Sequence, residues 1–142
     1  MGRARLGALE CRTAAGGDLK ATAVFLVEDD LAYAHAVAEV LDRADEFRLC
    51  ERFSSADECN VNKCRPGSIW LIDLGLPGNR SGLDLIRPIT NRGGLVLVAS
   101  VFEDETRVLA AIQHGAQGYF VKGDGNLLET IRMIQQGQAY GL

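Results

Sequence analysis

Three short apolar runs that each end on a charged residue constrain the fold of this chain more than any other feature. The runs are three or four residues long and lead directly into Glu28, Asp73 and Lys122. Runs of this kind, rich in β-branched and aromatic residues, are typical of strands buried on both faces in a parallel sheet between helices. Parallel strands bring their carboxyl ends to one edge of the sheet, where open α/β folds build their sites. We therefore expect the three charged side chains to meet at one edge.

Strand-like and helix-like segments alternate along the chain. The apolar patterns predict strands over residues 23–28, 47–53, 68–73, 95–99 and 118–121. They predict helices over residues 31–43, 82–90, 103–114 and 126–136, and a short helix after Ser54 or Ser55 that ends before Asn60. Asp30 is expected as an N-cap, and Pro88 is expected to shorten or bend its helix. The alternation predicts a doubly wound, flavodoxin-like α/β fold, with a five-stranded parallel sheet and helices on both faces.

Length and charge limit the classes of protein that this chain can represent. Its 142 residues suit one domain, expected over 23–142, and the low-complexity residues 1–22 are expected to form a disordered arm. Without those residues the chain carries 11 basic against 17 acidic side chains. An acidic body without a basic stripe argues against direct binding of nucleic acid by this stretch. No apolar run approaches the roughly 20 residues of a membrane helix, so we expect no membrane association.

The four cysteines do not have the spacing of a zinc site. Cys59 and Cys64 are not followed by a second pair of Cys or His residues. We interpret the cysteines as reduced thiols that pack like small apolar groups, which predicts a cytoplasmic protein. A disulfide between Cys59 and Cys64 is the alternative, because the segment between them resembles a loop.

The acidic residues at the strand ends indicate a site for a divalent cation. Asp29 and Asp73 follow different strands and can share a hard cation such as Mg²⁺, which takes about six oxygen ligands and usually keeps several waters. The Gly75 carbonyl is expected as a third protein ligand, and Glu28 can act through a water. Carboxylates packed this closely without a cation would repel one another and raise at least one pKa.

An anion is expected beside the cation. Lys122 offers a compact positive charge, and Ser100 supplies a hydroxyl at the same edge of the sheet. A cation, an ammonium and a hydroxyl around one carboxylate are the groups that phosphoryl transfer needs, since positioning and charge stabilisation do most of the work. Asp73 would be the nucleophile, as in other aspartyl-phosphate chemistry.

The set of residues resembles the receiver domain of response regulators in two-component signalling. The resemblance covers about residues 23–140 and rests on Glu28-Asp29, on Asp73 before the Gly75 and Pro77-Gly78 turn, on Ser100, and on Lys122 in the sequence Gly-Tyr-Phe-Val-Lys. The Gly-Tyr-Phe-Val-Lys motif and the Gly-Gln-Ala-Tyr sequence near the end resemble those of receivers of the NarL/FixJ type, which usually precede a DNA-binding domain. Many receivers place Pro after the lysine, whereas Gly123 follows it here.

The resemblance implies a role for each residue of the site. Asp73 would be the phosphoacceptor, and Glu28 with Asp29 would be the acidic pair for Mg²⁺. Ser100 and Lys122 would contact the phosphoryl group, and Tyr119 with Ser100 would act as the switch. The donor would be a sensor histidine kinase or a phosphotransfer protein. The output face would combine the segments 103–114, 118–121 and 126–136, and a homodimer could form through it.

Two other functions compete with a phosphorylated switch. A pseudo-receiver would keep the fold as a docking module, but the intact acidic pair, Asp73 and Lys122 argue against it. A haloacid-dehalogenase-like phosphatase would carry a second Asp two residues after the nucleophile, where this chain has Gly75. With no general acid there, turnover should be slow. We therefore expect a phosphoacceptor that assists its own phosphorylation and slow dephosphorylation, and not an enzyme.

Overall fold

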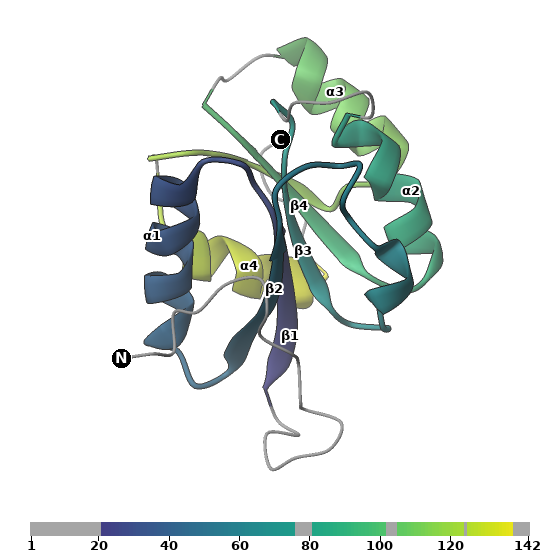
Figure 1. Ribbon diagram of the computed structural model, residues 1–142. Coiled ribbons are helices and arrows are strands. Elements are labelled where there is room, and N and C mark those ends of the chain that lie inside the picture. Colours follow the sequence, from purple (N-terminus) through teal and green to yellow (C-terminus); the bar gives the residue numbers. More distant parts are fainter. Residues whose placement is uncertain (1–20, 76–80, 102–104, 124, 138–142) are drawn as a thin grey trace.

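The computed structural model describes residues 21–75, 81–101, 105–123 and 125–137 and contains one parallel sheet (Figure 1). The predicted arm falls on residues outside this description, except for its last two, and so does most of the turn after Asp73. The strands pair in the order β2-β1-β3-β4-β5, which confirms the flavodoxin-like prediction. They are β1 (Thr22–Val27), β2 (Phe47–Phe53), β3 (Ile69–Asp73), β4 (Leu95–Ser100) and β5 (Gly118–Val121).

Helices cover both faces of the sheet. Figure 1 shows α1 (Leu31–Asp42) and α4 (Leu127–Gln135) on one face, with α2 (Leu83–Asn91) and α3 (Glu105–His114) on the other. Alternate residues of each central strand supply the two cores, as expected for strands buried on both sides. In β3, Leu71 packs with the α1 and α4 side, whereas Trp70 and Ile72 pack with the α2 and α3 side.

The side chains at the helix ends explain where the helices begin and stop. The Asp30 carboxylate accepts hydrogen bonds from the N–H groups of Ala32 and Tyr33, so Asp30 is the predicted N-cap of α1. Gly115 and Gly137 follow the ends of α3 and α4 with φ of 113° and 84°, conformations that glycine adopts without strain. Pro88 lies inside α2, which runs on past it to Asn91, so the proline does not end the helix.

The predicted short helix between residues 54 and 60 is wrong. The segment forms bends and turns, and a short 3₁₀-helix, η2 (Val61–Lys63), follows it. Ser55 does cap a turn by accepting the N–H of Glu58, but Ser54 bonds the Glu58 carboxylate. These local hydrogen bonds satisfy the segment without a helical ladder. The connection between β2 and β3 is therefore mainly a loop, in which Ala56, Cys59 and Cys64 are buried.

The three described cysteines, Cys50, Cys59 and Cys64, are buried thiols, and the alternative of a disulfide between Cys59 and Cys64 is not realised. Each belongs to the core on the side of α2 and α3, which agrees with thiols that pack as small apolar groups. In the part of the chain that the structure describes, no helix is long and apolar enough to span a membrane.

Candidate functional site

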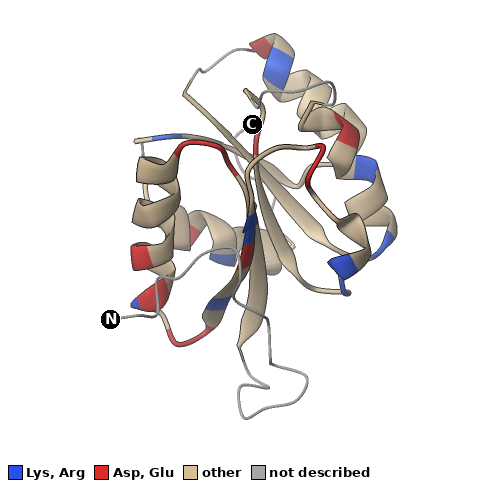
Figure 2. Ribbon diagram, viewed as in Figure 1, with Lys and Arg blue, Asp and Glu red and all other residues tan. Residues whose placement is uncertain are grey.

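The sheet topology brings the charged ends of three strands to one edge. Asp73 is the last residue of β3, the central strand, and pairs with Ala99. Glu28 follows β1 beside it, and Lys122 follows β5. The Lys122 N–H donates to the Ser100 carbonyl at 2.8 Å and fixes the start of the lysine's loop against β4. Figure 2 shows the acidic stretch after β1 and a basic residue after β5 at the same end of the sheet.

Lys122 bridges two of the carboxylates. Its Nζ lies 2.8 Å from Glu28 Oε1 and 3.4 Å from Asp73 Oδ2. The Glu28 side chain is only 1% exposed and that of Lys122 11%, so water screens the pair little. The other Glu28 oxygen accepts the N–H of Asp30, and the N–H of Gly75 donates to Asp73 Oδ1 at 3.0 Å. The structure thus brings together the three charged residues that end the apolar runs.

Asp29 adds a third carboxylate to the two that contact Lys122. Oxygens of Glu28, Asp29 and Asp73 lie within 4.8 Å of one another, and Asp29 is the exposed member. With all three ionised, the group carries two negative charges beyond the charge of Lys122. Carboxylate oxygens in such a cluster suit a hard divalent cation such as Mg²⁺, so the residues fit the predicted ion in donor type and in charge.

Burial and charge shift the pKa values at the site. Burial raises the pKa of the Glu28 carboxyl, and the charge of Asp73 raises it further, against the opposing hydrogen bond from Lys122. Burial alone would lower the pKa of Lys122, but the bond to Glu28 and the charges of both carboxylates outweigh it and raise that pKa. Lys122 therefore stays protonated, whereas ionisation of the Glu28 carboxyl is less favourable here than in water.

The two remaining predicted residues are buried near the site. Ser100 is the last residue of β4 and is 2% exposed. Tyr119 is 3% exposed and packs in the core on the side of α2 and α3. Gly123 follows Lys122 with a φ of 81°, and the described residues contain no cis peptide bond. The turn after the lysine is therefore built on a left-handed glycine and needs no proline.

Three further residues shape the site and escaped prediction from the sequence. Tyr33, in the first turn of α1, places its ring centroid 4.4 Å from Lys122 Nζ. Arg52 donates from Nη1 to the Glu28 carbonyl at 2.7 Å and so holds the end of β1. A Cβ on Gly82 would lie 2.7 Å from the Asp73 carbonyl oxygen, so only glycine lets α2 begin this close to β3. Of these, only the glycine before a helical pattern is a signal in the sequence.

Comparison with known proteins identifies the class that this fold and site define. Residues 24–132 match the response regulator receiver domain family, and the chain belongs to that family. It is 30% identical over 124 residues to the transcriptional regulatory protein DegU of Brevibacillus brevis, a match that covers 82% of this chain and 51% of DegU. It is 32% identical over 76 residues to the oxygen regulatory protein NreC of Staphylococcus aureus, covering 51% of this chain and 35% of NreC. The chain thus spans at most about half the length of these relatives.

Solved structures share the fold. The receiver domain of the response regulator NarL from Mycobacterium tuberculosis gives a TM-score of 0.75 at 17% identity, over 84% of this chain and 99% of that domain. The isolated receiver domain of RcsB from Salmonella enterica serovar Typhimurium, in the presence of the phosphomimetic BeF₃⁻, gives 0.74 at 16% identity, over 84% and 91%. The resemblance to receivers of the NarL/FixJ type is confirmed.

Proposed function

We propose that this receiver domain takes a phosphoryl group onto Asp73 and acts as a switch in two-component signalling. The observation that carries the proposal is the pairing of the buried Asp73 carboxylate with Lys122 at 3.4 Å, beside the acidic residues Glu28 and Asp29. A docking module without phosphorylation would not need an ammonium and three carboxylates at one edge of the sheet. This arrangement favours the phosphorylated switch over the pseudo-receiver.

In the proposed reaction an Asp73 oxygen attacks the phosphorus of a phosphohistidine. The new O–P bond forms as the N–P bond breaks, and the imidazole of the sensor kinase or phosphotransfer protein leaves with the electron pair. Glu28, Asp29, Asp73 and the Gly75 carbonyl would hold Mg²⁺. When bound, the cation neutralises charge on the phosphoryl oxygens. Lys122 and the Ser100 hydroxyl would contact those oxygens. A phosphatase of the haloacid-dehalogenase kind would carry an acidic residue at the position of Gly75, which here has no side chain. Hydrolysis should therefore be slow, and the domain should not act as an enzyme.

The proposed output is a change in the face formed by α3, β5 and α4, with Ser100 and Tyr119 as the switch residues. Leu109 on α3 is 54% exposed and gives this face an apolar contact point. RcsB has been solved as two dimers bound to two parallel DNAs. By analogy, we propose that phosphorylation controls self-association through this face and, in the complete protein, transcription. Buried, reduced thiols suit the cytoplasm, and we propose that the protein acts there.

The test is the intact mass of the protein after incubation with acetyl phosphate and Mg²⁺. We expect one added phosphoryl group on the wild type and none on Asp73→Asn, because the amide has nearly the same shape but is not nucleophilic. Asp45→Asn removes an exposed aspartate elsewhere and should be labelled like the wild type. Excess chelator and Asp29→Asn should each reduce labelling strongly. Full labelling of Asp73→Asn would refute the assignment, and full labelling in chelator would refute the role of the cation.

A further inference from the structure

Tyr33 reaches the site from the helix α1, whereas the charged groups of the site come from the ends of strands. The Asp30 carboxylate accepts the N–H groups of Ala32 at 2.9 Å and Tyr33 at 3.3 Å, which fixes the first turn of the helix over the strand ends. The Tyr33 ring then lies with its centroid 4.4 Å from Lys122 Nζ. This distance is within the roughly 6 Å over which an ammonium is attracted to the face of an aromatic ring.

Three groups therefore surround the ammonium of Lys122. Glu28 Oε1 lies at 2.8 Å, Asp73 Oδ2 at 3.4 Å and the Tyr33 ring on a further side. Because the lysine side chain is only 11% exposed, the ring replaces water as its neighbour, and a cation–π contact is stronger when it is shielded from water. Burial first, and then the charges of Glu28 and Asp73, raise the pKa of the Tyr33 phenol to about 12. The ring remains neutral and contributes its π face, not a charge.

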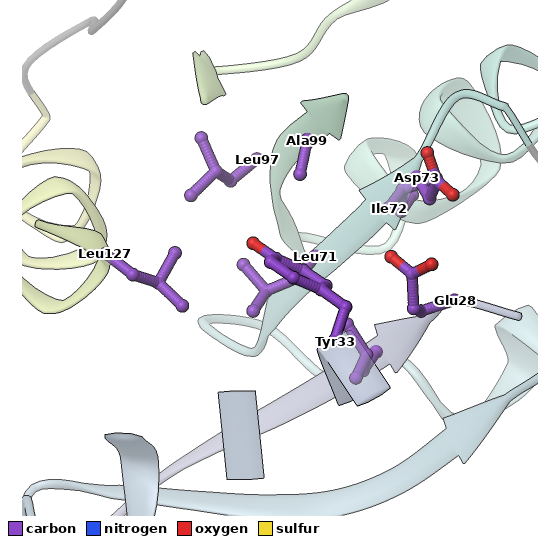
Figure 3. Close-up of a pocket in the computed structure, with 9 residues that line it drawn as sticks. Glu28, Tyr33, Leu71, Ile72, Asp73, Leu97, Ala99 and Leu127 are labelled. Carbon is purple, nitrogen blue, oxygen red and sulfur yellow. The ribbon is translucent and has the colours of Figure 1, made fainter. Parts of the chain in front are cut away.

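The hydroxyl of Tyr33 is not directed at the phosphoacceptor. Figure 3 shows the ring crossing above Leu71, with its oxygen pointing away from the carboxylates of Glu28 and Asp73 and toward the side of Leu97 and Leu127. These residues line a small pocket that the ring shares with the site. The end of the side chain thus faces aliphatic groups, and the ring is the part that meets Lys122.

We propose that Tyr33 is a positioning residue for Lys122, holding the ammonium between Glu28 and Asp73 before the phosphoryl group arrives. The inference rests on the proposed phosphorylation of Asp73. A charge that is already in place needs no reorganisation during transfer, so the contact accelerates the transfer step. Binding of the phosphodonor is unaffected, since Tyr33 acts through the lysine.

The test compares Tyr33→Leu with Tyr33→Phe. Leucine fills much of the space but has no π face, whereas phenylalanine keeps the ring and loses only the hydroxyl. With acetyl phosphate as donor and Mg²⁺ present, we expect Tyr33→Leu to lower the limiting rate of phosphorylation by roughly 2- to 30-fold, with an unchanged half-saturating donor concentration. Tyr33→Phe should behave like the wild type. Equal rates for all three proteins, or a loss in Tyr33→Phe equal to that in Tyr33→Leu, would overturn the proposal.

A second measurement reads the contact without any phosphorylation. The CH₂ protons next to the ammonium of Lys122 should show upfield ring-current shifts by NMR in the wild type and in Tyr33→Phe, and should lose them in Tyr33→Leu. Ordinary lysine shifts in the wild type would overturn the proposal even if Tyr33→Leu failed to fold. A wild type that shows the ring-current shifts but accepts no phosphoryl group would refute the proposed function while supporting the contact itself.

Discussion

At the scale of single residues, the site is an acidic cluster with one internal cation. Glu28 is almost fully buried, and its carboxylate has Lys122 and the Asp30 N–H as partners. Its pKa is nevertheless raised, chiefly by burial and then by Asp73. The native state therefore accommodates the charged carboxylate less well than the unfolded chain does, and a bound divalent cation would relieve this.

The first prediction concerns the free energy of unfolding of Glu28→Gln. Because the folded pKa of Glu28 lies above its unfolded value, its favourable contribution is complete below the unfolded pKa and is lost as the pH rises through the folded pKa. In chelator at neutral pH, Glu28→Gln should therefore be more stable than the wild type in urea unfolding. Its stability should also fall less as the pH rises from 4 to 8. Added Mg²⁺ should reverse the order, because a ligand of the native state stabilises it by RT ln(1 + c/Kd), where c is the free ion concentration, and the wild type should bind the ion more tightly than Glu28→Gln.

Glu39→Gln is the matched control, because it removes an exposed glutamate from α1. Its stability should lie within about 0.5 kcal/mol of the wild type under all conditions. If Glu28→Gln is the less stable protein in chelator, the ion pair with Lys122 outweighs the burial of the charge, and the expected gain in stability is wrong in sign.

The sequence could predict the charged residues of the site but not their aromatic and arginine neighbours. Glu28, Asp73 and Lys122 are visible because each ends an apolar run, and parallel strands share one edge. Tyr33 and Arg52 lie in a helix and in an edge strand, where either residue type is ordinary. Their contacts depend on how α1 and β2 sit against the strand ends, and no local pattern records that packing.

At the scale of elements, the crossover between β2 and β3 differs most from expectation. The prediction placed a helix there, but Ser55 accepts the Glu58 N–H, Ser54 bonds the Glu58 carboxylate, and the segment is a loop with η2 after it. The loop still covers the sheet, because its residues Ala56, Cys59 and Cys64 are buried in the core on the side of α2 and α3. The alternating pattern predicted helices correctly where the apolar stripe was long. It predicted a helix wrongly after Ser54 and Ser55, where serine hydroxyls form local hydrogen bonds instead.

The second prediction concerns Pro88 in α2. A proline inside a helix lacks the N–H that would bond the carbonyl four residues earlier, and its ring crowds that carbonyl. Pro88→Ala should raise the free energy of unfolding by about 1–3 kcal/mol. The gain comes from the higher helix propensity of alanine, and it is reduced because alanine gives the unfolded chain more conformational entropy than proline does. Urea denaturation monitored by circular dichroism would measure the change.

Pro66→Ala provides a control of opposite sign. Pro66 precedes Gly67, which has a φ of 86°, and the Ser68 N–H donates to the Arg65 carbonyl at 3.0 Å. This is the pattern of a type II turn, which favours proline at its second position. Pro66→Ala should therefore lower the free energy of unfolding by roughly 0.4–1 kcal/mol. A Pro88→Ala protein that is less stable than the wild type would contradict the prediction for α2.

At the scale of the whole molecule, backbone hydrogen bonds connect β3, which carries the proposed phosphoacceptor Asp73, to the proposed output face. The Leu74 N–H donates to the Ala99 carbonyl at 3.3 Å, and the Lys122 N–H donates to the Ser100 carbonyl at 2.8 Å. The ends of β3, β4 and β5 therefore form one continuous layer beneath the site. The sequence predicted the flavodoxin-like class to which this strand order belongs, since five apolar runs alternating with helical patterns restrict the topology.

The last prediction concerns amide hydrogen exchange with and without beryllofluoride, which stands in for a phosphoryl group on Asp73. A phosphoryl group adds negative charge and strong acceptor oxygens, so the Ser100 hydroxyl can turn toward it and the Lys122 ammonium, already beside Asp73, can pair with it. The contact shifts the population of states only by its differential interaction with them, so we expect partial changes in exchange and no new fold. Changes should extend from Leu74 through residues 100–101 into 105–123, and should spare the edge strand β2. Asp73→Asn should show no response, which controls for binding of beryllofluoride elsewhere. Changes confined to residues 73–75 in the wild type would mean that the site and the α3-β5-α4 face are not coupled.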